Sequence, residues 1–225
     1  MATSGTAAFN LDLQELVEEA GERCGYEIRT GYDFATARRS LNLMLADWAN
    51  RGLNMWTFEQ QSIPLVAGQA EYDLPVDTVD LMDVAIRTGV GITQNDLLIT
   101  RVSLSHHHST PTKQSPGRPL QFVVLRTAEP TITLWPVPNV SSTYTLVYWR
   151  LRRLQDAGAG GNTQDIPFRF LPAMVAGLAY YLARKGPGGI DRLGVLKTQY
   201  DEAMQVAMDE DRDKTPLRLV PGRSY

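Results

Sequence analysis

The chain has 225 residues, 43% of them hydrophobic and 21% charged, which suffices for one large or two small globular domains. Its formal charge of -3 at pH 7 lacks the basic surplus on which non-specific nucleic-acid binding usually depends. The single cysteine, Cys24, excludes an intramolecular disulfide and a thiolate metal cluster, and its place in an apolar helical series predicts a small buried side chain.

The N-terminal stretch MATSGTAAFN contains neither a basic region nor a long apolar run. We therefore expect no signal peptide and no transmembrane helix. This pattern predicts a protein that acts where it is made, or in an assembly formed there.

Two helices are predicted near the N-terminus. Asn10 is a suitable N-cap for the first helix, and Gly25 ends it. Asp33 is a suitable N-cap for the second helix, which ends at Gly52. The short link between the helices predicts an antiparallel pair. In each helix, apolar residues recur along one face: Leu13, Leu16, Val17, Ala20 and Cys24, then Phe34, Ala37, Leu41, Met44, Leu45 and Trp48.

From Gln61 onward the pattern becomes typical of β structure. Residues 62–66 and 71–74 flank a Gly-containing turn and predict a hairpin. No helix is predicted between the short strands of this region, which indicates an antiparallel sandwich or a barrel-like insertion. Five more strands are expected between clusters of Gly, Pro, Asn and Ser, at residues 81–87, 97–104, 120–126, 131–135 and 144–151.

Two segments are predicted to be exposed, mobile loops: 105–119, rich in His, Thr, Lys and Pro, and 155–164, which contains DAGAGGN. Helical spacing returns at Phe168 and continues, after a break at 185–189, to Ala207. Pro167 or Pro172 is expected near the start of the first of these two helices.

The second late helix is expected to end in the acidic run 209–213. The sequence that follows, KTPLRLVPGRSY, has two prolines and no helical period, so it predicts an extended tail.

The predicted fold class is therefore α+β. Two helices from each end of the chain are expected to pack into one bundle, made of residues 9–58 and 166–213. Residues 59–154 are expected to form an inserted antiparallel β domain, and residues 214–225 an extended C-terminal tail.

The histidines of the chain are the consecutive His106, His107 and His108. Adjacent side chains splay apart in a strand or a loop, so three in succession rarely converge on a metal without carboxylates from elsewhere. We therefore interpret them as an incidental polar loop, with adventitious nickel or zinc binding as the alternative. The sequence predicts no metal site and no cofactor.

Carboxylates cluster at Glu18–Glu19 and at residues 209–211, on helices with no second pair on which to converge. We interpret both clusters as solvated helix faces. The sequence contains no G-x-S-x-G, P-loop, H-E-x-x-H or Cys-His arrangement. The prediction is that the chain has no catalytic residues and is not an enzyme.

Arginines occur together on the second helix, at Arg38 and Arg39, and beside the last strand, at Arg150, Arg152 and Arg153. Either group could contact nucleic acid. At this net charge, the preferred interpretation is solvated charges, or partners for acids across a subunit interface. Five aromatic side chains are expected to pack in cores and not to stack on bases: Trp48, Trp56, Tyr72, Trp135 and Trp149.

A series of short motifs follows in order along nearly the whole chain: ARRSLN at 37–42, WANRGLNMW at 48–56, LVAG at 65–68, YDLP at 72–75, GRP at 117–119, LWPVP at 134–138, YWR at 148–150, FLP at 170–172 and LAYY at 178–181. In this order, the motifs resemble those of the adaptor proteins of tailed bacteriophages, the head-to-tail connector components of short-tailed phages. The large β insertion departs from the shorter adaptors.

The resemblance implies a structural virion protein, similar to tail accessory factors and tubular tail proteins. Such proteins form a homo-oligomeric ring, usually a dodecamer, beneath the phage portal protein. The ring links the portal to tail or nozzle proteins and lines the conduit used in DNA ejection, so double-stranded DNA passes without specific binding. The implied location is the neck of the virion, after assembly in the host cytoplasm and with no membrane partner.

In such relatives the C-terminal segment commonly docks on the portal protein. The resemblance gives this role here to the tail from residue 214 onward. Apolar side chains would supply the anchors, and basic ones would pair with acidic groups of the portal. The candidate portal-docking residues are Leu217, Arg218, Leu219, Val220, Arg223 and Tyr225.

Two other functions stay open. A virion-associated lytic enzyme or nuclease would need a convergent acid pair or a metal site. A DNA-binding accessory protein would bind duplex DNA with a steep dependence on salt.

Overall fold

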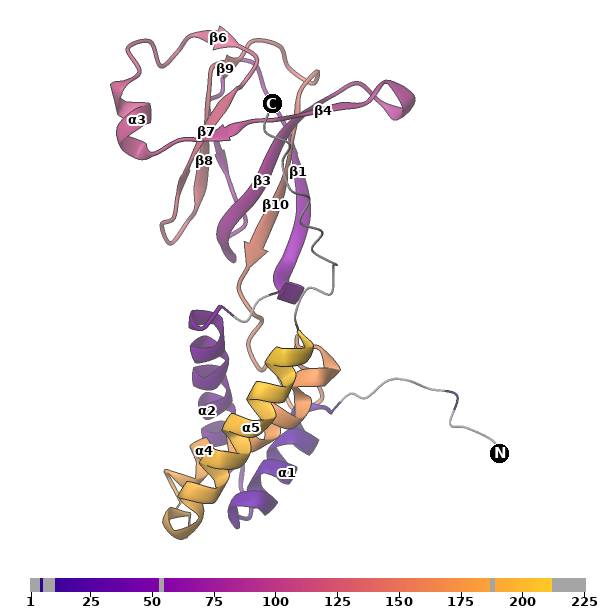
Figure 1. Cartoon of the computed structure of the whole chain (residues 1–225), viewed down its shortest axis with the longest axis vertical. Helices are drawn as coiled ribbons and strands as arrows, with labels where there is room; N and C mark the ends of the chain where they lie inside the picture. Colours follow the sequence, from indigo (N-terminus) through magenta and orange to yellow (C-terminus); the bar gives the residue numbers. More distant parts are fainter. Residues whose placement is uncertain (1–4, 6–10, 53–54, 187–188, 212–225) are drawn as a thin grey trace, which may run out of the picture. The chain divides into compact units, whose positions relative to one another are not determined.

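The structure is a computed structural model that describes residue 5 and residues 11–52, 55–186 and 189–211. The predicted α+β class is confirmed, with helices from both ends of the chain flanking a β region (Figure 1). The chain forms two compact units. One, the helical unit, contains Met1–Met55 and Gln155–Tyr225, and the other, the β unit, contains Trp56–Leu154.

Helix α1, Leu13–Cys24, begins at a capping box. The Asp12 carboxylate accepts a hydrogen bond from the Glu15 backbone N at 2.8 Å, and the Glu15 carboxylate accepts from the Asp12 N at 3.2 Å. Asp12 is therefore the N-cap, and the prediction of Asn10, which lies outside the described residues, was wrong. Gly25 ends the helix as predicted, because it adopts φ 75° and its N–H bonds the Glu22 carbonyl.

Helix α2 comprises Gly31–Asn50, and its N-cap is Thr30 and not the predicted Asp33. Asp33 is the third residue of the helix, where its carboxylate accepts from the Thr30 N at 3.0 Å. The Thr30 hydroxyl in turn accepts from the Asp33 N at 3.2 Å. Thr and Asp are both common N-cap residues. The capping box places Thr30 at the N-cap and Asp33 three residues later, where its carboxylate bonds back to the N-cap.

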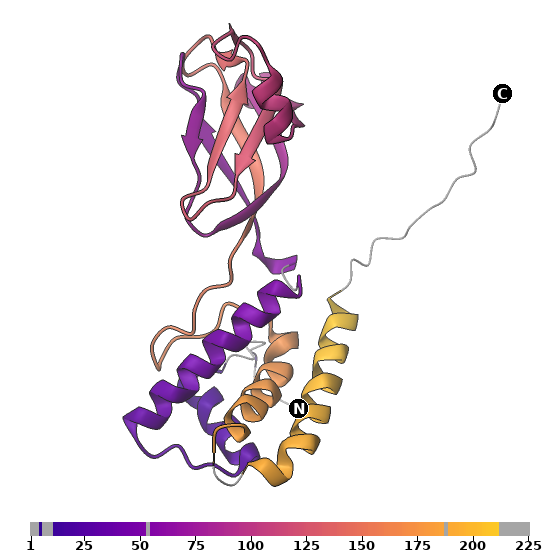
Figure 2. The ribbon, with the colours of Figure 1, turned by 90° about the vertical axis from the view of Figure 1, so that its left-hand side faces the viewer.

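The C-terminal helices are α4, Leu171–Ala183, and α5, Leu193–Glu210. Short 3-10 turns precede them, η3 at Phe168–Phe170 and η4 at Ile190–Arg192. Pro172 lies in the first turn of α4, where its missing N–H costs no hydrogen bond. Helix α4 is buried along most of its length because it contacts α1, α2 and α5 (Figure 2).

The core of the helical unit is centred on Trp48, which is fully buried. Its indole N–H donates to the Tyr200 hydroxyl at 2.7 Å, and its ring lies 5.9 Å from the Phe170 ring. Burial is favourable for the large indole only if its N–H finds a partner, which α5 supplies here.

Residues 155–164 form a largely exposed loop, as predicted, and backbone hydrogen bonds connect this loop to the start of α1. The carbonyls of Asn162 and Gly160 accept from the N–H groups of Leu13 and Gln14 at 3.0 and 3.1 Å. Ala157 is buried, and its N–H donates to the Asn42 side chain at 2.9 Å. The first N–H groups of any helix need external acceptors, and this glycine-rich segment supplies them to α1.

The β unit contains two four-stranded sheets. The first has the order β1-β10-β3-β4, with β1 Phe58–Pro64, β10 Thr145–Arg152, β3 Thr78–Thr88 and β4 Asn95–Leu98. The second has the order β2-β8-β7-β5, with β2 Glu71–Asp73, β8 Thr131–Trp135, β7 Gln121–Leu125 and β5 Thr100–Arg101. The pairing is antiparallel except for β5 with β7, and for β6, Pro116–Gly117, with β9, Val137–Pro138.

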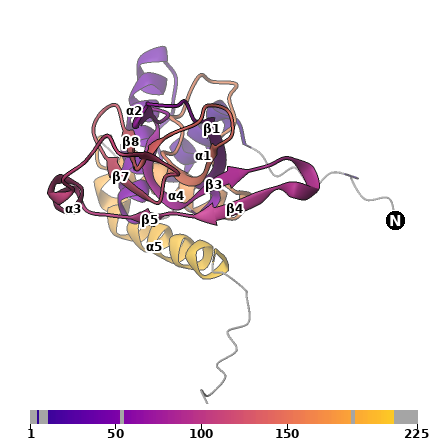
Figure 3. The ribbon, with the colours of Figure 1, turned by 90° about the horizontal axis from the view of Figure 1, so that it is seen from above.

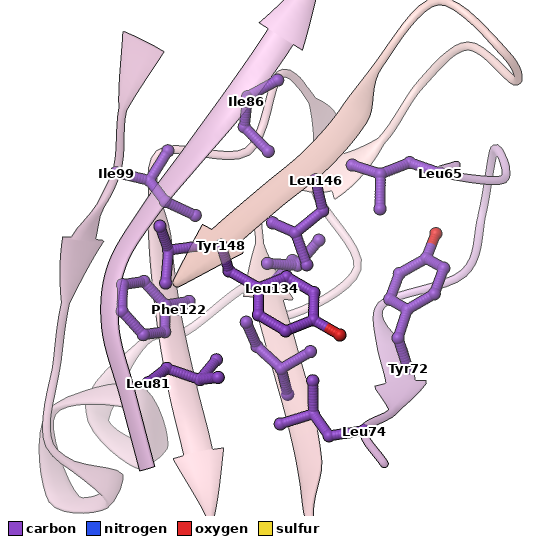
Figure 4. Packing of buried hydrophobic residues seen from close by; sticks show 12 residues of the cluster. Leu65, Tyr72, Leu74, Leu81, Ile86, Ile99, Phe122, Leu134, Leu146 and Tyr148 are labelled. Carbon is purple, nitrogen blue, oxygen red and sulfur yellow. The ribbon is translucent and has the colours of Figure 1, made fainter. Parts of the chain in front are cut away.

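The predicted hairpin at 62–66 and 71–74 was wrong, because β1 pairs with β10 and β2 pairs with β8. The intervening turn crosses from one sheet to the other. Leu65 and Tyr72 enter one core from opposite sheets (Figure 4). A Gly-containing turn between two stretches of alternating apolar and polar residues can connect the strands of a hairpin or strands of two different sheets. The sequence pattern alone therefore favours the hairpin, which is the simpler arrangement.

The predicted strand 97–104 is also divided. β4 ends at Leu98 in the first sheet, β5 begins at Thr100 in the second, and a helix begins at Leu104. The buried Ile99 lies at the crossing point, within the core shared by the two sheets. This core contains Leu81, Val84, Ile86, Phe122, Ile132, Leu134, Leu146 and Tyr148 (Figure 4).

Candidate functional site

The three histidines lie in a short helix, α3, Leu104–Ser109, where a loop was predicted. Ser103 caps it, because its hydroxyl accepts from the His106 N at 3.1 Å. Successive residues of a helix point about 100° apart. Among the residues that the structure describes, no group of three or more His, Cys, Asp or Glu side chains could hold a metal ion.

The surroundings of the histidines disfavour positive charge. Lys113 Nζ lies 3.3 Å from His108 Nδ1. Burial, and then the nearby Lys113 and His108, lower the pKa of His107. A cation would therefore meet an ammonium group beside His108, with no carboxylate among the described residues to complete a ligand set.

Arg150, considered above as a nucleic-acid contact, is only 4% exposed and lies inside the β unit. It donates to Asp77 at 2.6 Å, to the Thr78 hydroxyl at 3.0 Å and to Glu59 at 3.1 Å. The hydrogen bond and charge of Arg150 lower the pKa of Asp77. Arg152 adds a second cation 3.7 Å from Glu59. This group of charges joins β1, β3 and β10, so its role is structural.

The arginines of α2 differ from those of β10. Arg38 donates to the Gly158 carbonyl at 3.3 Å, and Arg39 donates to the Thr36 hydroxyl at 3.2 Å. Both are exposed. Arg38 therefore helps hold segment 155–164 against the helical unit.

The two carboxylate clusters have different surroundings. Glu19 pairs with Arg23 at 2.8 Å on the exposed face of α1, as expected for a solvated helix face. Asp211 contradicts that expectation, because its side chain is only 6% exposed and accepts from Arg169 Nε at 2.8 Å. This ion pair connects the end of α5 to η3. The sequence did not predict the pair, because Asp211 lies in an acidic run that is typical of a solvated helix end.

A groove of about 490 Å³ lies between α1 and α4. Its carboxylates come from α1 alone, and its apolar side chains come from α4 and from Leu11, which precedes α1. Such a lining offers no pairing of a nucleophile with a base from facing elements. The groove residues include Glu15, Glu18, Glu22, Leu171, Pro172 and Val175.

Trp149 is 44% exposed, although the sequence predicted that it packs in a core. It follows the buried Tyr148 on β10 and points to the opposite face of the sheet. Sequence reasoning missed this outward face. Residues 146–149 of β10 are all apolar, a run typical of a strand that is covered on both faces, so the pattern does not distinguish Trp149 from a core residue.

The candidate portal-docking residues, Leu217 to Tyr225, lie outside the described residues. No helix in the described part of the chain is long and apolar enough to cross a membrane.

The chain was compared with protein families, curated proteins and solved structures. A family model described as SU10 adaptor protein matches residues 11–221. None of the curated proteins matches the chain. Among solved structures, a chain from the neck of an empty GTA particle, computed with C6 symmetry, is 12% identical. That match covers 100% of this chain and 97% of that chain, with a TM-score of 0.28, too low to support an argument.

Proposed function

Because the chain belongs to the SU10 adaptor protein family, we propose that it is a structural head-to-tail adaptor of a phage-like particle. In this proposal, copies of the chain form a ring beneath the portal protein, link it to the tail or nozzle proteins and line the conduit for DNA. The observation that carries the proposal is the family match, which takes in both the helical and the β unit.

The geometry agrees with a structural role for the charged residues. The Arg150 group joins three strands, and the Arg169–Asp211 pair joins η3 to α5. These residue types could also serve catalysis, but here they hold elements together. We therefore propose a non-enzymatic protein, with no cofactor and no resident metal.

A closed ring needs heterologous contacts, in which one surface of each copy meets a different surface of the next. We propose twelve copies, as the resemblance implies, assembled in the host cytoplasm and retained in the neck of the virion. The net charge of -3 agrees with a lumen through which double-stranded DNA passes without being bound.

We also propose that the C-terminal tail attaches each copy to the portal, through Leu217, Arg218, Leu219, Val220, Arg223 and Tyr225. The composition supports this role, since three apolar side chains and one arginine lie between two prolines, and a second arginine and a tyrosine follow. Several weak tail contacts on one ring would add up through multivalency.

The test is co-sedimentation with portal rings made from the same genome. The full chain is expected to sediment with the portal, while a chain that lacks residues 215–225 is expected to keep its circular dichroism spectrum and melting temperature but stay in the supernatant. Sedimentation of the truncated chain at the full-length level would contradict the tail assignment. Failure of the full chain to bind portal would contradict the adaptor function.

A further inference from the structure

Two apolar surfaces of the β unit are exposed to solvent. The first is the tip of the β3–β4 hairpin, residues 89–93, which extends beyond the rest of the β unit (Figure 3). Val90 is 86% exposed and Ile92 is fully exposed. These two side chains are the most exposed of the large hydrophobic side chains in the described part of the chain.

The tip has a well-defined conformation. The Thr93 hydroxyl accepts from the Val90 N at 3.3 Å and donates to the Val90 carbonyl at 2.9 Å. Gly89 adopts φ 75°, and a Cβ there would lie 2.2 Å from the Thr93 carbonyl oxygen. At the base of the hairpin, Arg87 donates to both carboxylate oxygens of Asp96, at 2.8 and 2.7 Å. A surface that is ordered in advance loses little conformational entropy on binding.

The second surface is the outward face of the sheet β1-β10-β3-β4. Leu146 and Tyr148 of β10 point into the core, so the alternation of the strand turns Trp149 outward. Gln60 of β1 is the partner of Trp149, and Phe58 lies on the same face two residues away. Leu98 of β4 lies on the same face, because it pairs with Ala85 of β3, the partner of Val147 of β10. Met82 of β3 is 56% exposed and lies opposite Trp149, in the stretch between Leu81 and Val84 where the register of β3 with β10 is irregular.

The size of this face restricts how it can be used. Four strands about 4.8 Å apart and roughly seven residues long give a footprint of about 400 Å². A stable interface usually covers about 800 Å² on each partner. The sheet face is therefore too small for a stable symmetric dimer. A face of this size suits a small projecting element such as the hairpin tip, and in a closed ring such a contact adds to the other heterologous contacts between neighbouring copies.

The two surfaces of one copy do not meet, because Val90 and Ile92 lie beyond Arg87, the last residue of β3 that pairs with β10. We propose that the hairpin tip of one copy packs on the outward sheet face of a second copy, against Trp149, Phe58 and Met82. This contact would join neighbours in the proposed ring, and in that respect it rests on the proposed function.

Cysteine cross-linking tests the contact. Protein carrying Val90→Cys is mixed with protein carrying Gln60→Cys, beside Trp149, and oxidised, both free at high concentration and in the fraction that sediments with portal. The matched control replaces Gln60→Cys with Glu71→Cys, an exposed position of the second sheet. Cys24 is buried and stays in place. The Val90–Gln60 disulfide is expected to form at least about tenfold faster than the control pair, because the contact raises the local concentration of the thiols.

Equal rates for the two pairs in both fractions would overturn the proposed contact. If the proteins sediment with portal while the rates stay equal, the adaptor function stands and this contact is wrong. If cross-linking is selective but portal binding fails, the contact stands and the adaptor function is wrong.

A second variant separates packing from chance proximity. Ile92→Ser in the Val90→Cys protein is expected to lower the cross-linking rate to the control level without changing the melting temperature, because Ile92 is exposed in the single copy. Val76→Ser, at another exposed valine of the β unit, is expected to leave the rate unchanged. If both Ile92→Ser and Val76→Ser lower the cross-linking rate to the control level, or if neither does, the hairpin tip has no specific role in the contact.

Discussion

Arg150 shows how a charged side chain can belong to the interior of the β unit. Its partners are Asp77, Glu59 and Thr78, and the two carboxylates are about half exposed while Arg150 is buried. Removing a buried charged side chain leaves its partner charges unpaired. The resulting loss of folding stability is largest when the partner charges are buried too.

We predict that Arg150→Met lowers the free energy of unfolding by about 2 kcal/mol, which is below the range for a fully buried pair because the carboxylates can still reach water. Urea denaturation followed by tryptophan fluorescence measures this change. Arg23→Met is the matched control, since its pair with Glu19 lies on an exposed helix face and contributes little. A loss at Arg150 no larger than at Arg23 would contradict the structural role.

The same group of charges predicts a pH dependence. Arg150 lowers the pKa of Asp77 in the folded state, so the unfolded state binds a proton more readily. The stability that this pair contributes is present above the unfolded-state pKa of Asp77 and is lost as the pH falls from there through the lowered folded-state pKa. Arg150→Met is expected to flatten the fall in unfolding free energy over that range. An unchanged slope would show that other carboxylates control acid unfolding.

The sequence could not predict this group. Glu59 and Asp77 are 91 and 73 residues away from Arg150 along the chain. Only the pairing of β10 between β1 and β3 brings them together. The sequence pattern predicted the strands but contained no information about which strands are neighbours.

At the scale of single elements, the close approach of helices in the helical unit depends on Gly177 of α4. A Cβ at this position would lie 2.6 Å from Met44 Sδ and 2.8 Å from Tyr200 Cε2. Helix α4 can therefore pack tightly between α2 and α5 only without a side chain here.

We predict that Gly177→Ala destabilises the chain by about 1–3 kcal/mol, because the added methyl overpacks this core. Gly194→Ala in α5 is the control. No neighbour lies within 4 Å of a Cβ there, so the better helix propensity of Ala is expected to stabilise by up to about 1 kcal/mol. Thermal unfolding of both variants measures the difference. A stabilised Gly177→Ala protein would contradict the packing described for α4.

Elements differ in how well local sequence predicts them. Helices α1 and α2 were predicted because their apolar residues repeat at helical spacing, and the cap positions alone needed correction. Segment 155–164 was predicted correctly as a loop, but its hydrogen bonds to the N-terminus of α1, to which it supplies carbonyl groups, have no local signal in the sequence. The hairpin assigned to 62–74 failed because a turn between strands has the same composition whether the strands pair or enter opposite sheets.

At the scale of the whole molecule, the class and the family were accessible from the sequence, because motif order and changes of hydrophobic period persist along the chain. The candidate contact surfaces were not. Val90 and Ile92 lie between the predicted strands 81–87 and 97–104, and Trp149 was predicted to pack in a core. Only the register of β3, β4 and β10 shows that these side chains lie on exposed surfaces. Apolar residues that contact only another copy of the chain have the same sequence pattern as apolar residues of the core. The sequence of one chain therefore does not distinguish the two.

The central claim is that this chain is a structural adaptor that assembles on the portal. The most direct measurement is electron microscopy of the full chain mixed with portal rings from the same genome. We predict an additional ring of density on one face of the portal. In this ring, one copy of the chain is expected at each symmetry-related position around the central axis. Portal rings without added density, while the chain elutes separately as folded single copies, would contradict the claim.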